Sequence, residues 1–466
     1  MAIRNVLLID PPYLGRNVHW WDHVGSHMPG LGLPSLAAWL EHRGHRVYIV
    51  DGHVERMDVH TPERLLARFR PDLVGITAMT PVVPAALAVA RACRRLFPGV
   101  PIVLGGAHPT VLPEDVLAHS EVDFVVRGEG EVTLAELVEG SDPATLAGLS
   151  WRAVDGIVHN PDRPLLPDLD ALPSPAWHLL PLSRYRPGLG TYRKLPAVSL
   201  MTARGCPNRC TYCFNLFGHQ VRRQTPTRVV EEVRRLRAVH GIRQIQFYDD
   251  TFTLRKDWVL ELCGRFAREV PDVAWTCYGR VDTVDADMLD SMARAGCHQI
   301  CFGVESGDPE VLRTVEKHIT IDQVRTAVRL AREAGIRPRG TFMIGNQGET
   351  PASMQRTIDL ALSLDIDVAL FSVATPYPGT AFYRWAEAEG RLVTRDWGQY
   401  DRNSTTVRLA GADPETVWAF HRAAYRAFYL RPKFVLRYGL QLRHLRHLWD
   451  GFRVLAAVGT YRRVGA

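Results

Sequence analysis

The first 140 residues alternate short apolar runs with segments of helical periodicity. A buried strand is predicted at each apolar run, and the five runs are residues 4–10, 45–51, 72–79, 101–107 and 122–130. The segments between them repeat apolar positions every three or four residues, as amphipathic helices do. This alternation predicts a Rossmann-like domain, in which helices cover both faces of a parallel sheet.

The loops after these strands hold the candidate ligand-binding residues of the domain. Ligands of such a sheet lie at the carboxyl ends of the strands, where the strand order reverses. The loops at those ends are residues 10–13, 77–81, 105–110 and 127–131. Two of them contain paired glycines, which let the backbone approach a bulky ligand closely.

A second alternation of strand and helix follows a proline-rich stretch. Residues 141–196 have no sustained periodicity and are predicted to be an ordered linker. Six strands are then predicted at residues 197–206, 243–250, 274–280, 299–305, 337–345 and 367–376. Six strand–helix repeats predict a partial (β/α)6 barrel over residues 197–395, with its chemistry at the carboxyl ends of the strands. Residues 396–466 are predicted to be a helical C-terminal region.

The composition is that of an ordinary globular protein. Hydrophobic residues make up 46% of the 466 positions and charged residues 23%. No run of about 18 apolar residues could cross a bilayer, and no signal peptide is apparent, so a cytoplasmic location is expected. Only 4 of the 56 basic residues are Lys, a bias typical of a GC-rich genome. The net charge of +6 therefore does not predict a nucleic-acid partner.

The positive charge is concentrated near the C-terminus. From Arg402 onward there are 12 basic and 3 acidic residues. This tail is a candidate contact for an anionic substrate, a partner or a membrane surface. Solvated helix faces whose Arg stems cover apolar surface are the commoner arrangement.

Three of the eight cysteines form a compact group, Cys206, Cys210 and Cys213, just after the first predicted barrel strand. Structural zinc needs four protein ligands, so a distant His would have to complete a zinc site here. A cubane iron–sulfur cluster held by three cysteines instead keeps one iron open for a ligand. The spacing favours a catalytic cluster over a structural metal.

The cysteine group resembles the signature of the radical S-adenosylmethionine (SAM) enzymes, including the aromatic residue Tyr212 before Cys213. The resemblance implies that the three thiolates bind a [4Fe–4S] cluster and that SAM chelates its fourth iron. Reductive cleavage of SAM then yields a 5′-deoxyadenosyl radical. The implied SAM-binding residues are Tyr212, Asp249, Asp250, Arg280, Glu305, Ser306 and Gly345. Taken alone, the two aspartates would more commonly cap the N-terminus of a helix, and Glu305 with Ser306 would form only a capping turn.

The domain order resembles the cobalamin-binding subfamily of these enzymes over nearly the whole chain. In such relatives the corrin ring lies over the carboxyl ends of the first sheet. The resemblance implies cobalamin contacts at Pro11, Thr77, Gly105, Gly106, His108, Arg127, Gly128 and Glu129. The pattern around Asp51 and His53 has Arg56 where a cobalt-binding motif has Gly. We therefore expect base-off cobalamin without a protein His on cobalt, with His108 as the one candidate exception.

The resemblance implies a class B-like methyltransferase that acts on an unactivated carbon of a small molecule. The 5′-deoxyadenosyl radical would abstract a hydrogen atom from the substrate, and the substrate radical would take a methyl group from methylcobalamin. A second SAM would then remethylate the cobalamin. An electron donor such as flavodoxin or ferredoxin is implied. A cyclase or rearrangement enzyme without methyl transfer is the alternative within this architecture. A tRNA methylthiotransferase is disfavoured because the first domain has only Cys93 for a second cluster, and a non-enzymatic sensor would not need the SAM contacts.

Overall fold

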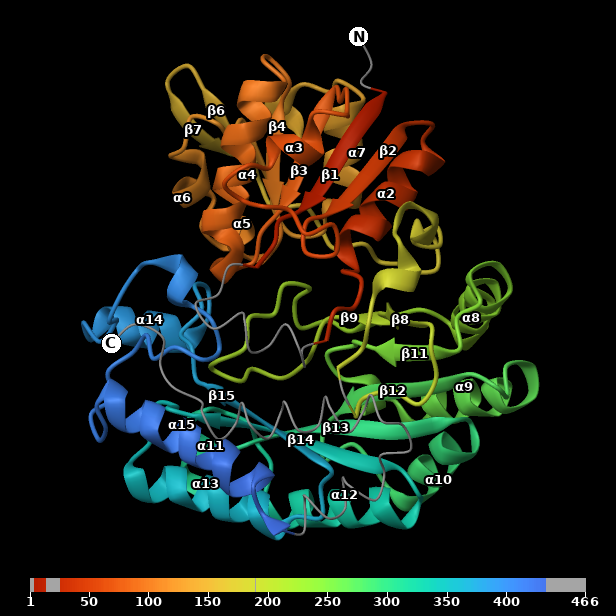
Figure 1. Cartoon of the computed structure of the whole chain (residues 1–466), viewed down its shortest axis with the longest axis vertical. Helices are drawn as coiled ribbons and strands as arrows, with labels where there is room; N and C mark the ends of the chain where they lie inside the picture. Colours follow the sequence, from red (N-terminus) through yellow and green to blue (C-terminus); the bar gives the residue numbers. More distant parts are fainter. Residues whose placement is uncertain (1–3, 14–25, 189, 433–466) are drawn as a thin grey trace.

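The computed structural model describes residues 4–13, 26–188 and 190–432, and it consists of two α/β sheets joined by a long connection (Figure 1). The first sheet has the strand order β2-β1-β3-β4-β5-β6-β7. Its strands are β1 Asn5–Asp10, β2 Arg46–Asp51, β3 Leu73–Thr77, β4 Ile102–Gly105, β5 Phe124–Val126, β6 Leu149–Ala153 and β7 Gly156–His159. The first five strands are parallel, which confirms the Rossmann-like prediction.

Helices cover both faces of this parallel sheet. They are α2 Gly32–His42, α3 Glu63–Leu66, α4 Val83–Leu96, α5 Ala107–Val111, α6 Pro113–Leu117 and α7 Gly130–Val138. The two apolar layers are separate clusters, one around Val74 and Leu87 and the other around Val6 and Leu134. The chain order reverses between β1 and β3, so the carboxyl ends of these strands form the ligand edge of the sheet.

The sheet is larger than the sequence indicated. Strand β6 pairs antiparallel with β5 and β7 pairs antiparallel with β6, and both lie inside the stretch 141–196, which was expected to be an ordered linker without sustained periodicity. Both are short, and the outer strand β7 is mostly exposed, so neither has the apolar run that marks a buried strand. The rest of that stretch, up to β8, carries only short 3₁₀ turns.

The second sheet is all parallel, with the order β15-β14-β13-β12-β11-β8. Its strands are β8 Ala197–Leu200, β11 Gln244–Phe247, β12 Ala274–Gly279, β13 Cys297–Glu305, β14 Arg337–Ile344 and β15 Val368–Val373. Its outer helices are α8 Pro226–His240, α9 Lys256–Glu269, α10 Ala286–Arg294, α11 Pro309–Thr314, α12 Ile321–Glu333 and α13 Pro351–Ser363. This is the predicted partial (β/α)6 barrel.

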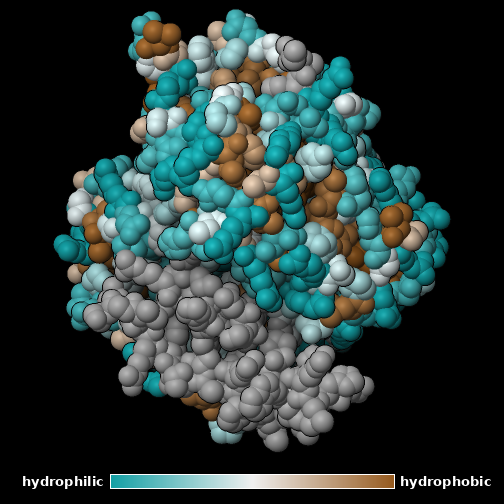
Figure 2. Space-filling model, turned by 45° about the horizontal axis from the view of Figure 1, so that its top comes forward, coloured by the Kyte–Doolittle hydropathy of each residue, from teal (hydrophilic) through white to brown (hydrophobic). Residues whose placement is uncertain are grey.

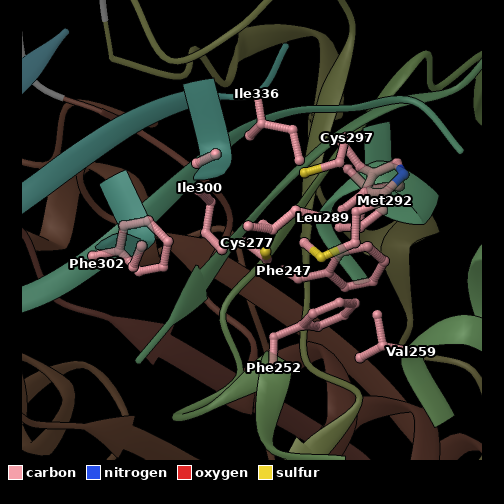
Figure 3. Packing of buried hydrophobic residues seen from close by; sticks show 14 of the residues in the cluster. Phe247, Phe252, Val259, Cys277, Leu289, Met292, Cys297, Ile300, Phe302 and Ile336 are labelled. Atoms are coloured by element: carbon pink, nitrogen blue, oxygen red, sulfur yellow. The ribbon is translucent and has the colours of Figure 1, made fainter. Parts of the chain in front are cut away.

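The barrel is held by apolar side chains that point outward from its strands to the helices. Phe247, Cys277 and Ile300 from three neighbouring strands belong to one buried cluster with Leu289 and Met292 of α10 (Figure 3). Because side chains alternate along a strand, the residues between them face the barrel interior, and these are largely polar. The outer layer therefore supplies stability and leaves the interior free for chemistry.

After the barrel come α14 Ala381–Ala388 and α15 Pro414–Tyr429. The latter packs on α13 and β15, so the described part of the C-terminal region is helical as expected. Most of the basic tail lies outside the described residues. No described helix is long and apolar enough to cross a membrane. On the face shown in Figure 2, the coloured surface is mostly hydrophilic, and its apolar residues form small separate groups.

The outward apolar layer should dominate the stability of the barrel. Phe302 of β13 is fully buried, so Phe302→Ala should cost about 3–5 kcal/mol through lost burial and a new cavity. The matched control is Val239→Ala on α8, where Val239 is 67% exposed and the change should stay within about 0.5 kcal/mol. Urea unfolding followed by Trp fluorescence checks both, and equal midpoints for the two variants would contradict this packing.

Candidate active site

The cysteine loop is closed at its base by a short antiparallel hairpin. Strands β9 Ala203–Arg204 and β10 Arg222–Arg223 pair with each other and enclose residues 205–221. Gly205 has φ +97°, and a Cβ there would lie 2.4 Å from the carbonyl oxygen of Gln220. Only glycine fits this close approach, so the backbone turns sharply just before Cys206.

The three thiols of this loop lie close enough to influence one another. Desolvation raises the pKa of Cys213 to about 12, and the charges of Cys210, Asp250 and Cys206 add to the increase. Asn208 donates a hydrogen bond from Nδ2 to the Cys206 sulfur at 3.3 Å. Clustered thiolates repel one another unless a cationic centre binds them.

The arrangement differs from that of a single-metal site. Within the described ranges, no three His, Cys, Asp or Glu side chains converge closely enough to hold one metal ion. The cysteines of a cubane cluster bind different irons, so their sulfur atoms lie farther apart than the ligands of one zinc. The three closely spaced cysteines of one loop suit an iron–sulfur cluster that keeps one iron open for a ligand.

Asp249 supports the cysteine loop from the end of β11. Its buried carboxylate accepts hydrogen bonds from the Thr202 N–H (2.6 Å), the Thr202 hydroxyl (2.5 Å) and the Ala203 N–H (3.2 Å). Both oxygens are thus bonded within the protein, which makes Asp249 a positioning residue. Its neighbour Asp250 is exposed beside Cys213.

Three other predicted residues gather at the neighbouring strand ends. Arg280 after β12 forms a bidentate pair with Asp282, and the charges of Cys210 and Cys206 help to raise its pKa against the effect of burial. Glu305 at the end of β13 has φ +68°, a conformation that is costly for a non-glycine residue. Burial raises the pKa of Tyr212, and the nearby charges of Glu305, Cys210 and Cys213 add to the increase, so this phenol lies close to both Glu305 and the thiols.

Lys317 belongs to the site and was missed in the sequence. It is buried, and its Nζ lies 3.0 Å from a carboxylate oxygen of Glu305. Its backbone oxygen also accepts a hydrogen bond from Arg280 at 3.0 Å. It follows α11 in an ordinary charged stretch, and nothing in the local sequence distinguishes it from a surface Lys.

Ser306 and Gly345 have structural roles in the described geometry. Ser306 is fully buried, lies 3.1 Å from the Thr357 hydroxyl and accepts the Asp308 N–H, so it belongs to the capping turn before α11. This is the capping turn that the sequence also allows, and a contact between Ser306 and SAM stays a prediction. The Gly345 N–H donates to Glu349, whose pKa burial raises to about 8.

A cavity of about 140 Å³ opens at the ligand edge of the first sheet. Its lining includes five of the predicted cobalamin residues, Thr77, Gly105, Gly106, Gly128 and Glu129. Gly106 has φ +101°, and a Cβ there would lie 2.8 Å from the Ala78 oxygen, so this wall requires glycine. The barrel contributes Arg204, Leu216 and Phe217, which come from the cysteine loop and its hairpin.

The other three predicted residues do not line this cavity. Arg127 turns away to the Asn160 oxygen and Asp162. His108 is buried, with its ring nitrogens 3.4 Å from Thr80 and 3.1 Å from Asp115. Pro11 is also absent from the lining. All three lie in loops at the ligand edge, and their contacts with cobalamin stay predictions.

A buried network of charges joins the cavity to the cysteine loop. Glu129 accepts hydrogen bonds from Arg204 at 2.9 Å and from Arg222 at 2.8 Å, and Glu131 accepts one from Arg204 at 2.6 Å. Although burial opposes it, the bonds from Arg222, the Leu166 N–H and Arg204 lower the pKa of Glu129. The carboxylates belong to the first domain and the arginines to the hairpin, so the network connects the two sheets.

Comparison with known proteins matches two separate parts of the chain to domain families. Residues 200–361 match the radical SAM superfamily and residues 21–138 the B12 binding domain. An uncharacterized methyltransferase of Pyrococcus horikoshii, PH0819, is 36% identical over 94% of this chain and 95% of its own length. The chain belongs to the cobalamin-binding radical SAM family.

Two further likenesses bear on function and on fold. An anaerobic magnesium-protoporphyrin IX monomethyl ester cyclase of Rubrivivax gelatinosus is 26% identical over 92% of this chain and 78% of the cyclase. The solved structure of the radical SAM methyltransferase TsrM from Kitasatospora setae has a TM-score of 0.71, with 98% of this chain and 99% of TsrM covered at 21% identity. The second likeness concerns the fold alone.

The cofactors of this radical SAM enzyme are a [4Fe–4S] cluster, SAM and cobalamin. The described residues fit all three groups. The thiol triplet suits a cluster with one open iron, the polar strand ends beside it suit the charged part of SAM, and the glycine-walled cavity suits a bulky ligand. The cluster and cobalamin regions share the cysteine loop.

Loss of Glu129 should loosen the contact between the sheets. Glu129→Gln leaves the buried Arg222 without a carboxylate partner, while Arg204 keeps only Glu131, and it should cost about 3–5 kcal/mol. The matched control Glu136→Gln breaks a more exposed pair with Arg163 and should cost at most about 1 kcal/mol. Thermal midpoints and limited proteolysis of the connection check this. Equal midpoints for the two variants would contradict it.

The same network predicts acid sensitivity. The pKa of Glu129 is lower in the folded protein than its unfolded value of 4.5. Its contribution to stability is therefore present above about pH 4.5 and is lost as the pH falls through the lowered folded value. Urea midpoints measured from pH 6 down to about pH 3 should fall less steeply in Glu129→Gln than in the wild type. Parallel curves would refute the linkage.

Proposed function

We propose that this enzyme transfers a methyl group to an unactivated carbon of a small molecule. The observation that carries the proposal is the shared loop, because Arg204, Leu216 and Phe217 flank the cysteines and also line the first-domain cavity. A radical-forming centre and a methyl-carrying cofactor would then lie on opposite sides of one short segment. The full-length relative named as a methyltransferase supports the same reading.

Within this proposal, Cys206, Cys210 and Cys213 hold the cluster, and SAM bound to it supplies the radical when one electron is delivered. Asp249 and the Gly205 turn hold the cysteine loop in place. Tyr212, Arg280 and the Glu305–Lys317 pair border the thiols, where they can orient the ammonium and carboxylate groups of SAM.

The first-domain cavity would hold cobalamin through close backbone contacts. Its wall combines glycines with apolar side chains such as Leu8 and Leu36, which exclude water from a large organic ligand. We keep the expectation of base-off cobalamin, because both nitrogens of His108 face other groups and His53 Nε2 lies 2.9 Å from His27. Flavodoxin or ferredoxin as electron donor and a cytoplasmic location also stay predictions.

The physical reason for a radical route lies in the acceptor. A saturated carbon has no lone pair with which to displace methyl from a sulfonium, so polar transfer is not available to it. Hydrogen abstraction creates an acceptor that can take a methyl group from the cobalt of methylcobalamin. The protein's part is to hold the substrate carbon between the two cofactors and to exclude water.

Radical cyclisation without methylation is the second candidate, because a magnesium-protoporphyrin ester cyclase is 26% identical over most of the chain. Product analysis after anaerobic reconstitution with candidate substrates separates the two. Methyl transfer adds one CH₂ to the product and yields S-adenosylhomocysteine together with 5′-deoxyadenosine. Turnover that forms only 5′-deoxyadenosine and methionine would reject methylation and favour the cyclase reading.

The cluster assignment is tested by removing one thiol. Cys213→Ala should lose cluster iron and reductive SAM cleavage, because two thiolates do not retain a cubane. The matched control Cys93→Ala removes a buried thiol of α4 and should keep both. Iron content, visible absorbance and 5′-deoxyadenosine release measure the outcome. Normal SAM cleavage by Cys213→Ala would overturn the assignment.

The cobalt assignment is tested by two histidine variants. His53→Ala and His108→Gln should leave the absorbance and paramagnetic resonance spectra of bound cobalamin unchanged, because neither imidazole is expected on the metal. A change only in the amount of cobalamin bound would mean that the histidine helps to shape the pocket without binding cobalt. Loss of a histidine-ligated signal in either variant would contradict the base-off expectation.

A further inference from the structure

A small polar cavity lies inside the barrel and is lined by residues of β11, β12, β13 and β14. Its volume is about 50 Å³, enough for one small functional group. Its lining residues are Ser26, Thr191, Gln246, Tyr248, Thr276, Cys277, Tyr278, Gln299, Cys301 and Arg339. None of these was predicted as a site residue from the sequence.

Strand alternation explains the polarity of this cavity. Phe247, Ile300 and Phe302 point outward into the apolar layer (Figure 3). Their neighbours in the chain therefore point inward, and these include Gln246 and Cys301. A barrel interior that served only stability would be filled with branched apolar side chains. Polar groups at these positions indicate a binding role.

Arg339 of β14 is the charged residue that lines the cavity, and it has no acidic partner among the described residues. Its guanidinium is half-buried, and Nη1 donates a hydrogen bond to the Gln299 side-chain oxygen at 3.4 Å. Its Nε is shielded from solvent and has no hydrogen-bond acceptor among the described residues. No Asp or Glu of the described chain forms an ion pair with it, whereas Arg332 on α12 pairs with Asp367 at 2.6 Å.

The surroundings of Arg339 are positively charged. The pKa of His298 is lowered to about 3, by burial first and then by the charges of Arg193, Arg337 and Arg339. Arg337 has Asp367 at 3.9 Å, so its charge is partly offset, whereas no carboxylate of the described residues lies within ion-pair distance of Arg339. A shielded charge without a counter-charge is costly, and a bound anion would remove the cost.

We propose that Arg339 binds an anionic group of the substrate, a carboxylate or a phosphoryl group, inside the barrel. This inference rests on the proposed function, because it names the class of molecule that is methylated. Gln299 and Tyr278 border the same space and can complete the hydrogen bonds to the anion.

The position of Arg339 also limits the length of the substrate. Tyr278 lies two residues before Arg280 on the strand path, and Cys301 lies four residues before Glu305. At roughly 3.3 Å per residue, the cavity is about 7–13 Å from the strand ends beside the cysteine loop. The substrate would therefore carry its anionic group about 10 Å from the carbon that reacts.

Binding of small anions to the anaerobic cofactor-loaded enzyme tests the site without the natural substrate. Acetate and methylphosphonate are the probes, and acetamide is the neutral control, each followed by saturation-transfer NMR. We expect Kd values of about 1–10 mM for the preferred anion and no binding of acetamide. The better probe distinguishes a carboxylate from a phosphoryl substrate.

Two charge variants decide whether Arg339 is responsible. Arg339→Met should raise the Kd of the anion at least tenfold, whereas the matched control Arg337→Met, two residues earlier on β14, should change it less than threefold. Cluster and cobalamin absorbance verify that each variant is loaded. Equal anion binding by Arg339→Met and the wild type would overturn the proposal, as would the absence of binding by either anion to the wild type.

A third variant tests the site independently, in case Arg339→Met does not fold. Gln299→Glu is nearly isosteric and places a carboxylate beside the guanidinium, so it should block the probes while raising the thermal midpoint. Unchanged anion binding in this variant would contradict the proposal.

The two proposals fail separately in this design. If the wild type cleaves SAM and never transfers methyl, while anions still bind through Arg339, the methyltransferase proposal fails alone. If methyl transfer occurs and Arg339→Met binds anions normally, the anion site fails alone.

Discussion

The buried charge network between Glu129, Glu131, Arg204 and Arg222 is the interaction on which the rest of the site depends. The side chains of all four residues are at most 12% exposed. Ionic groups at this depth are tolerated only when fully paired, so a displaced hairpin would leave charges uncompensated. The two domains therefore have one favourable docking geometry, and the cysteine loop is held next to the first-domain cavity.

The outward-facing side chains of the barrel stabilise the fold, and the inward-facing side chains are available for chemistry. Its outward side chains form one continuous apolar layer with the helices, and its inward side chains are polar. Parallel strands bring their carboxyl ends to one edge, where Tyr212, Arg280 and the Glu305–Lys317 pair surround the thiols. The same alternation places Arg339 in the interior, so a substrate pocket and a cofactor site arise from one strand pattern.

Local patterns predicted the strands and helices of this protein well but carry no information on which partner each side chain contacts. Apolar runs identified all five parallel strands of the first sheet and all six of the barrel, because buried strands of parallel sheets need continuous apolar sequence. Strands β6 and β7 lack that signal, since they lie at the sheet edge. His108 and Ser306 sit in the expected loops, yet their polar atoms bond to Asp115 and Thr357.

The sequence by itself determined the periodicity of each element, the spacing of Cys206, Cys210 and Cys213 and the glycine-rich strand ends, because these depend on residues close together in the chain. Only the tertiary structure decided which distant residues meet. Glu129 and Arg204 are 75 positions apart, and no local pattern pairs them. Arg339 likewise reads as one Arg among many, and it becomes a candidate site because folding places its charge in a cavity without an acid.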